Sequence, residues 1–268
     1  MPATQDNSMT PASTPRAPGG TIAVAGATGG LGAAICETLA QGGSPLLLGY
    51  HHNAAKAETL RNRLAALGAP VATCPVDLQD AASVDRFLEE ASALSGGLCA
   101  VVNATGPAIP LRPLTEIPAA EFQRILRCDV EGAFNLLTAA GRQLAASGGG
   151  SLLQLLTTAV LRTLENDAMS GVPKTAAMGL VRQLARELGP ANVRVNGIAP
   201  GVIDAGIVHS SFTTDPVAEG VISECLARTP MPRMGKPEEV GALAAFLLSE
   251  PASYINGQII GIDGGYSA

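Results

Sequence analysis

The chain has 268 residues and an acidic balance, with a formal net charge of −6. This length predicts one large α/β domain. Hydrophobic residues make up 47% of the chain and aromatic residues only 3%, so its core is expected to be large and aliphatic. This balance excludes the basic surface that nucleic acid or an anionic membrane would require. No apolar run approaches the length of a membrane span, and we expect a cytoplasmic protein.

The first twenty residues are rich in Pro, Ala, Ser and Thr and contain no apolar stretch. This composition predicts a disordered tail over residues 1–20, followed by a single domain over residues 21–268. The five cysteines are scattered, odd in number and without C-x-x-C spacing. We therefore expect reduced thiols, with neither a disulfide framework nor a metal site.

Short apolar runs alternate with helical stretches along the domain. The expected strands cover residues 21–25, 45–49, 71–74, 98–102, 151–156, 193–198 and 258–262. The expected helices cover residues 30–41, 54–67, 82–94, 119–144, 174–188 and 237–248, with Pro173 in the first turn of the fifth. This alternation predicts a parallel, doubly wound α/β sheet, the Rossmann fold. Residues 203–230 lack a strand and predict a lid, or alternatively a surface helical hairpin.

The turn between the first expected strand and the first helix is rich in glycine. Gly26 permits the tight turn, Gly30 lets a diphosphate approach the backbone, and Gly32 allows the helix to pack closely on the strand. The N-terminus of that helix offers free N–H groups to phosphate. We therefore predict a dinucleotide site that includes Gly26, Thr28, Gly30, Leu31 and Gly32.

The second expected strand ends without the acidic side chain that would bind the ribose hydroxyls of NAD. Tyr50, His51 and His52 lie there instead, and the nearest cation is Lys56. An uncharged pocket accepts the 2′-phosphate of NADP, and a protonated His51 would help. We predict NADP(H) as the cofactor, contacted by Tyr50 and His51, with NAD(H) as the alternative. The histidines could equally form only an exposed loop.

Later motifs follow the order of one enzyme family. They comprise residues 77–78, 103–106, 196–201, 233–240 and 262–265. From about Thr21 to its C-terminus the chain resembles a short-chain dehydrogenase/reductase, most closely the 3-oxoacyl-(acyl carrier protein) reductase type. The resemblance implies that Asp77 contacts adenine beside Leu78. It also implies cofactor contacts at Asn103, Ala104, Lys174, Pro200, Gly201 and Ile203.

The resemblance implies a hydride-transfer tetrad of Asn, Ser, Tyr and Lys. Aligned by motif, these positions hold Asp129, Thr157, Ser170 and Lys174. Thr157 keeps a hydroxyl for the carbonyl oxygen, and Lys174 can bind the nicotinamide ribose. Asp129 places a negative charge where a neutral amide is expected.

Ser170 is the most serious departure, because it removes the phenol. A phenol has a pKa near 10, whereas an aliphatic alcohol is about as weak an acid as water, near 15.7. The gap of roughly 6 units gives an upper bound of about 8 kcal/mol against proton donation, at about 1.36 kcal/mol per unit. Serine is also shorter, so its oxygen falls short of the phenol position.

No other side chain is an obvious substitute for the phenol. The three tyrosines, Tyr50, Tyr254 and Tyr266, lie in other motifs. His209, in the expected lid, has a suitable pKa for an acid. Glu165 and Asp167 lie just upstream of Ser170 and could point into the site, but solvated loop carboxylates are the simpler interpretation.

Three functions remain open. The first is an NADP(H)-dependent ketone or 3-oxoacyl reductase with altered proton delivery, through an ordered water, a substrate group or His209. The second is a non-catalytic subunit that pairs with an active homologue. The third is a fold re-used for a non-redox reaction, with Asp129 as base. The apolar segments around the expected site favour a hydrophobic carbonyl substrate, and the resemblance implies a homotetramer or a heteromer with a homologous chain.

Overall fold

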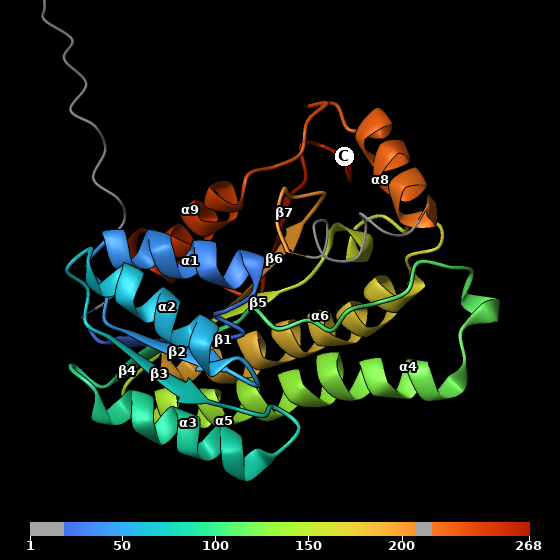
Figure 1. The fold of residues 1–268 in the computed structure, drawn as a ribbon. Coiled ribbons are helices and arrows are strands. Elements are labelled where there is room, and N and C mark those ends of the chain that lie inside the picture. The colour runs from blue at the N-terminus through green and yellow to red at the C-terminus, as the bar shows by residue number, and fades with distance from the viewer. Residues whose placement is uncertain (1–18, 207–215) are drawn as a thin grey trace, which may run out of the picture.

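A computed structural model describes residues 19–206 and 216–268, in which one parallel sheet of seven strands forms the centre of the molecule (Figure 1). The strands are β1 Thr21–Ala25, β2 Leu46–Tyr50, β3 Val71–Pro75, β4 Leu98–Asn103, β5 Gly150–Leu155, β6 Val193–Pro200 and β7 Ile259–Ile262. Their order in the sheet is β3-β2-β1-β4-β5-β6-β7. The direction in which successive strands are added to the sheet reverses between β1 and β4, and ligands bind at the carboxyl ends of the strands at such a point. The predicted doubly wound α/β fold is confirmed.

Helices cover both faces of the sheet (Figure 1). One face carries α1 Gly30–Gln41, α2 Ala54–Ala65 and α9 Pro237–Leu248, and the other carries α3 Ala81–Ala93, α5 Gly132–Ala146 and α6 Ala168–Leu188. Aliphatic side chains fill both layers, with Phe87 as a large, fully buried aromatic. Burial on both sides explains why the strands are continuously apolar rather than alternating.

A π-helical turn, η2 Arg127–Glu131, joins α4 Ala119–Leu126 to α5. The sequence predicted one continuous helix over residues 119–144, and the extent is correct, but the pattern gave no sign of the wider turn. Single π turns inside helices are frequent at functional sites. This one carries Asp129, whose side chain is buried.

The first turns of α6 differ from the prediction. The helix begins at Ala168 instead of Lys174, and Pro173 lies inside it. Proline has no N–H, so it cannot bond the carbonyl four residues earlier, yet the helix continues through it. The prediction that Pro173 lies in the first turn was wrong, and Ser170 is consequently helical.

Smaller elements complete the described chain. They are α8 Pro216–Arg228, η1 Leu114–Glu116, η3 Thr158–Val160, η4 Gly189–Ala191 and η5 Glu250–Ala252. The expected lid over residues 203–230 includes α8, while residues 207–215, with His209, lie outside the described residues, as do residues 1–18 of the expected tail. None of the helices in the described ranges is long and apolar enough to cross a membrane.

Candidate active site

A cavity of about 510 Å³ opens at the carboxyl ends of the strands. Its wall includes Gly30 and Leu31 from the glycine turn, Thr157 after β5, and Ser170 and Lys174 from α6. It also includes Ala104, Pro200, Gly201 and Ile203, all four of which were expected to contact the cofactor. The fold therefore brings residues from distant parts of the sequence to one hollow.

The glycine turn has no room for side chains. Gly26 adopts a φ of 77°, and a Cβ there would lie 2.8 Å from the carbonyl of Ala104. A Cβ on Gly32 would lie 2.2 Å from the Gly26 oxygen, and one on Gly30 would lie 2.5 Å from the backbone nitrogen of Gly206. These contacts require glycine at all three positions.

The start of α1 suits a bound diphosphate. No side chain caps the first N–H groups of this helix. Gly29, Gly30 and Leu31, at its start, line the cavity. The helix dipole adds positive potential at the same end. The turn therefore fits the phosphates of a dinucleotide. Thr28 belongs to the turn, but its side chain does not line the cavity.

The residues expected at the adenosine end lie outside this cavity. Tyr50 ends β2, and Nε2 of His51 lies 3.6 Å from Oδ2 of Asp77. Both of those side chains are about half exposed. Leu78 is buried, and its Cβ lies 3.0 Å from where a side chain on Gly132 would begin. Lys56, in contrast, does line the cavity.

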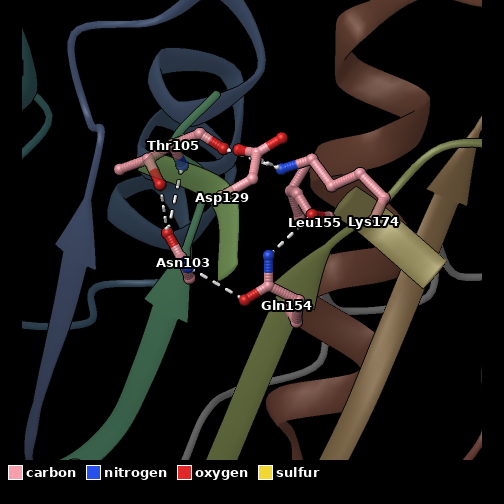
Figure 2. Close-up of polar contacts among 6 residues, drawn as sticks. All are labelled: Asn103, Thr105, Asp129, Gln154, Leu155 and Lys174. Carbon is pink, nitrogen blue, oxygen red and sulfur yellow. Dashed lines mark hydrogen bonds and ion pairs between the residues drawn. The ribbon is translucent and has the colours of Figure 1, made fainter. Parts of the chain in front are cut away.

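Asn103 holds the floor of the site together (Figure 2). Its side-chain nitrogen donates to Oε1 of Gln154 at 2.9 Å, which ties β4 to β5. Its Oδ1 accepts from the backbone N–H and the hydroxyl of Thr105 at 3.2 and 2.7 Å. Gln154 in turn donates to the carbonyl of Leu155. Asn103 and Gln154 are both buried, so this amide network positions the residues above it.

Lys174 is held by an ion pair (Figure 2). Its Nζ lies 3.1 Å from Oδ1 of Asp129 and donates to the carbonyl of Thr105 at 3.2 Å. Only 10% of the Lys174 side chain and 2% of the Asp129 side chain are exposed. Burial raises the pKa of Asp129, and the ammonium of Lys174 offsets part of that shift. The π turn thus delivers a carboxylate directly to the lysine.

Two titratable side chains that were not predicted as site residues, Asp167 and Tyr266, also line the cavity. Asp167 is partly buried, and burial raises its pKa to about 7, although the nearby Ser170 side chain lowers the pKa and opposes part of the shift. Its interpretation as a solvated loop carboxylate was wrong, whereas Glu165 is exposed as expected. Tyr266 is only 4% exposed and lies on the cavity wall, far in sequence from Ser170. Its distance along the chain gave no signal of this placement.

The remaining candidates are simply located. Thr157 caps η3, accepting from the N–H of Ala159 at 3.3 Å, and lines the cavity. None of the five cysteines, all of which lie in the described residues, forms a disulfide, and Cys225 of α8 reaches the cavity wall. Across residues 19–206 and 216–268, no cluster of three or more His, Cys, Asp or Glu side chains could hold a metal ion.

A doubly wound sheet whose glycine turn opens onto a cavity with an ammonium and hydroxyls defines a nucleotide-dependent enzyme fold. A family model described as Enoyl-(Acyl carrier protein) reductase matches residues 26–267. A tropinone reductase homolog of Arabidopsis thaliana is 34% identical over 250 residues, covering 93% of this chain and 92% of the relative. The 7α-hydroxysteroid dehydrogenase of Escherichia coli is 30% identical over 242 residues, covering 90% and 92%.

Solved structures agree with these relatives. A short-chain type dehydrogenase/reductase from Mycobacterium ulcerans is 30% identical with a TM-score of 0.85, covering 92% of this chain and 90% of that one. A 7α-hydroxysteroid dehydrogenase complexed with NADH and 7-oxo glycochenodeoxycholic acid gives 30% identity and a TM-score of 0.85, covering 96% and 98%. The chain belongs to the short-chain dehydrogenase/reductase family. It is an NAD(P)H-dependent oxidoreductase of the class that acts on CH–OH and C=O groups.

Proposed function

We propose that this chain is an NADP(H)-dependent reductase of a hydrophobic ketone or 3-oxoacyl compound, with a proton delivery that differs from the family pattern. One observation carries the proposal: a single cavity joins the glycine turn to Thr157, Ser170 and Lys174. When bound, the cofactor supplies the hydride for the carbonyl carbon. The hydroxyl of Thr157 holds the carbonyl oxygen by a hydrogen bond. Lys174 holds the nicotinamide ribose and adds positive charge beside the developing alkoxide.

The proposed substrate class follows from the cavity wall. Ile109, Leu156, Leu164, Val221 and Ile222 line the cavity and present aliphatic surface. An aliphatic wall favours an acyl chain or an apolar ring over a small charged substrate. Among the relatives, a cis-4-hydroxycyclohexanecarboxylate dehydrogenase of Sinomonas cyclohexanicum and a levodione reductase structure also carry the names of ring compounds. A cyclic ketone is therefore the first substrate to test.

The proposed preference for NADP(H) rests on charge. No carboxylate ends β2, and Lys56 lines the cavity near the glycine turn. An ammonium there stabilises the extra phosphate of NADP, whereas a carboxylate would repel it. Asp77 is the nearby negative charge, and His51 lies beside it at 3.6 Å.

Oligomeric state and location complete the proposal. Phe134 on α5 is 52% exposed and Val172 on α6 is 43% exposed, so both helices present apolar surface to a partner. We propose a homotetramer built on these helices, or a heteromer with a homologous chain, in the cytoplasm.

The decisive experiment has two stages. NADPH and NADH are titrated separately by fluorescence, and the protein alone is then assayed on a panel of cyclic and acyl ketones. Tighter binding of NADPH and turnover of an apolar ketone are expected. Failure to bind either nucleotide would refute the cofactor assignment.

A second candidate function has its own support. The ion pair with Asp129 engages the ammonium that the reaction needs, and Ser170 replaces the phenol. A subunit that binds nucleotide without turning over would have this arrangement. Nucleotide binding without turnover, and activity only beside a homologous chain, would favour it over the reductase.

A further inference from the structure

The first turn of α6 places a carboxyl next to the serine that replaces the phenol. Asp167 occupies the position that precedes the helix, but its side chain does not cap the backbone N–H groups there. Ser170 follows one helical turn later, where its backbone N–H donates to the Asp167 carbonyl at 3.1 Å and its side chain lies near enough to the Asp167 carboxyl to lower the pKa of that group. Both residues line the same cavity as Thr157 and Lys174. A carboxyl at this position commonly serves the helix as a cap, but Asp167 does not, which leaves its carboxyl available to the cavity beside Ser170.

Resting on the proposed reductase function, we propose that Asp167 supplies the proton of ketone reduction through the hydroxyl of Ser170. One hydride and one proton are added to each carbonyl, and the proton is the one delivered here. The carbonyl oxygen takes the Ser170 proton as its C=O π pair moves onto oxygen. The Ser170 oxygen takes the Asp167 proton in the same event, so no free serine alkoxide forms. Solvent water then reprotonates the Asp167 carboxylate, and alcohol oxidation runs these transfers in reverse.

This relay explains how a serine hydroxyl, which is too weak an acid by itself, can deliver a proton. A serine hydroxyl that must give up its proton unaided is about as weak an acid as water. When a carboxyl replaces that proton as it leaves, the acidity that matters is that of the carboxyl. Burial holds the pKa of Asp167 at about 7, where it can both keep and release a proton near neutral pH.

The other titratable groups on the cavity wall are less suited to the task. They are Lys56, Lys174, Cys225, Asp263 and Tyr266. Lys174 is tied to Asp129. Burial opposes ionisation of Asp263, but hydrogen bonds from Ser267 and Thr158 outweigh it and hold its pKa below the usual range, so it carries no proton to give. Burial raises the pKa of Cys225 to about 11, and the nearby Asp167 adds to the shift.

Tyr266 is the strongest rival, because it is the phenol on this cavity. Burial raises its pKa, the nearby Cys225 adds to the shift, and Arg162 and Arg228 oppose it. A phenol acting as the family's acid needs the opposite shift, produced by an adjacent ammonium. The side chains that shift the pKa of Tyr266 are Cys225, Arg162 and Arg228, whereas the one that shifts the pKa of Asp167 is Ser170.

The first test uses the protein without cofactor. The infrared band of a protonated carboxyl is followed from pH 4 to pH 9 in the wild type, Asp167→Asn and Glu165→Gln. A band that titrates near pH 7 is expected in the wild type and in Glu165→Gln, whose exposed carboxylate lies two residues away, and its loss is expected in Asp167→Asn. Absence of any such band from the wild type would overturn the proposal, whether or not a variant folds.

The second test measures turnover against pH for the same proteins and for Ser170→Ala. The wild-type kcat should fall as pH rises above about 7, since the donor loses its proton. Asp167→Asn and Ser170→Ala should each lower kcat by about 10²–10⁴-fold and abolish that pH limb. Nucleotide affinity should stay unchanged in Asp167→Asn, which separates this inference from the cofactor assignment.

Two outcomes would contradict the relay. A wild type that binds nucleotide and reduces ketones while Asp167→Asn keeps both the rate and the pH limb would reject Asp167. Loss of the limb in Tyr266→Phe alone would assign the donor to Tyr266. Failure of the wild type to bind nucleotide would instead reject the proposed function on which the relay depends.

Discussion

At the scale of single residues, the pair formed by Asp129 and Lys174 sets the electrostatics of the site. The two side chains are buried together with a separation of 3.1 Å. Removing one member of such a pair leaves an uncompensated charge, which costs more than the pair itself contributes. The family position holds a neutral amide by resemblance, so the carboxylate is the distinctive feature here.

Asp129→Ala should therefore lower the free energy of unfolding by about 3–5 kcal/mol, because Lys174 is left buried without its partner. Asp129→Asn should cost less, since an amide oxygen still accepts from the ammonium. Urea unfolding at pH 7 measures both. The matched control is Glu131→Ala, an exposed carboxylate in the same π turn, with an expected change within about 0.5 kcal/mol. Equal effects of the two alanine variants would show that the buried pair is not special.

Asp167 should make stability depend on pH in a direction unusual for a carboxylate. Its pKa is raised from 3.8 to about 7, so between these values the native state holds more protons than the unfolded state. Stability then decreases as pH rises through this window. The free energy of unfolding can fall by at most about 4 kcal/mol, at about 1.36 kcal/mol per pKa unit, and the partial exposure of Asp167 makes the loss smaller.

Asp167→Asn should remove this pH dependence. The stability of the variant relative to the wild type should therefore increase between pH 5 and pH 8. Urea unfolding at those two pH values, for both proteins, gives the difference directly. A wild-type minus variant difference that is the same at both values would mean that Asp167 has an ordinary pKa in the folded protein.

At the scale of elements, α1 and its turn are the most tightly constrained. A Cβ on Gly32 would lie 2.2 Å from the Gly26 oxygen, and backbone atoms cannot yield to it. Gly32→Ala should push α1 away from the turn, weaken NADPH binding at least about tenfold, and cost about 1–3 kcal/mol of stability. Fluorescence titration and urea unfolding measure the two effects. Gly220→Ala on α8, where nothing lies within 4 Å of the new Cβ, should change neither binding nor fold.

The elements also show what sequence can and cannot predict. β1, α1 and α9 begin and end where expected, because apolar runs there are bounded by glycine or proline at the turns. The start of α6 was missed, because Pro173 resembles a first-turn proline although it lies inside the helix. The glycine turn was predictable from local spacing alone. The approach of Asp167, Cys225 and Tyr266 to one cavity depends on tertiary packing, which no local pattern encodes.

At the scale of the whole molecule, the apolar surfaces of α5 and α6 bear on assembly. Phe134→Glu should shift the proposed tetramer towards smaller species, because it places a charge at the centre of an apolar contact. Light scattering after size-exclusion chromatography measures the mass. Leu67→Glu, 49% exposed beyond α2, is the matched control and should leave the mass unchanged. A monomeric wild type would remove the assembly proposal.

The π turn makes the position of Asp129 depend on residue count as well as on residue type. Five residues occupy a turn in which the ring of each hydrogen bond contains one residue more than in an α-helix. Deleting one residue there would restore the α-helical hydrogen-bond pattern, and a residue within the turn that moves by one position would rotate by about 100° around the axis. The carboxylate would swing away from the lysine with its chemistry unaltered. A frame-preserving loss of a single codon would thus uncouple these two charges without changing either of them.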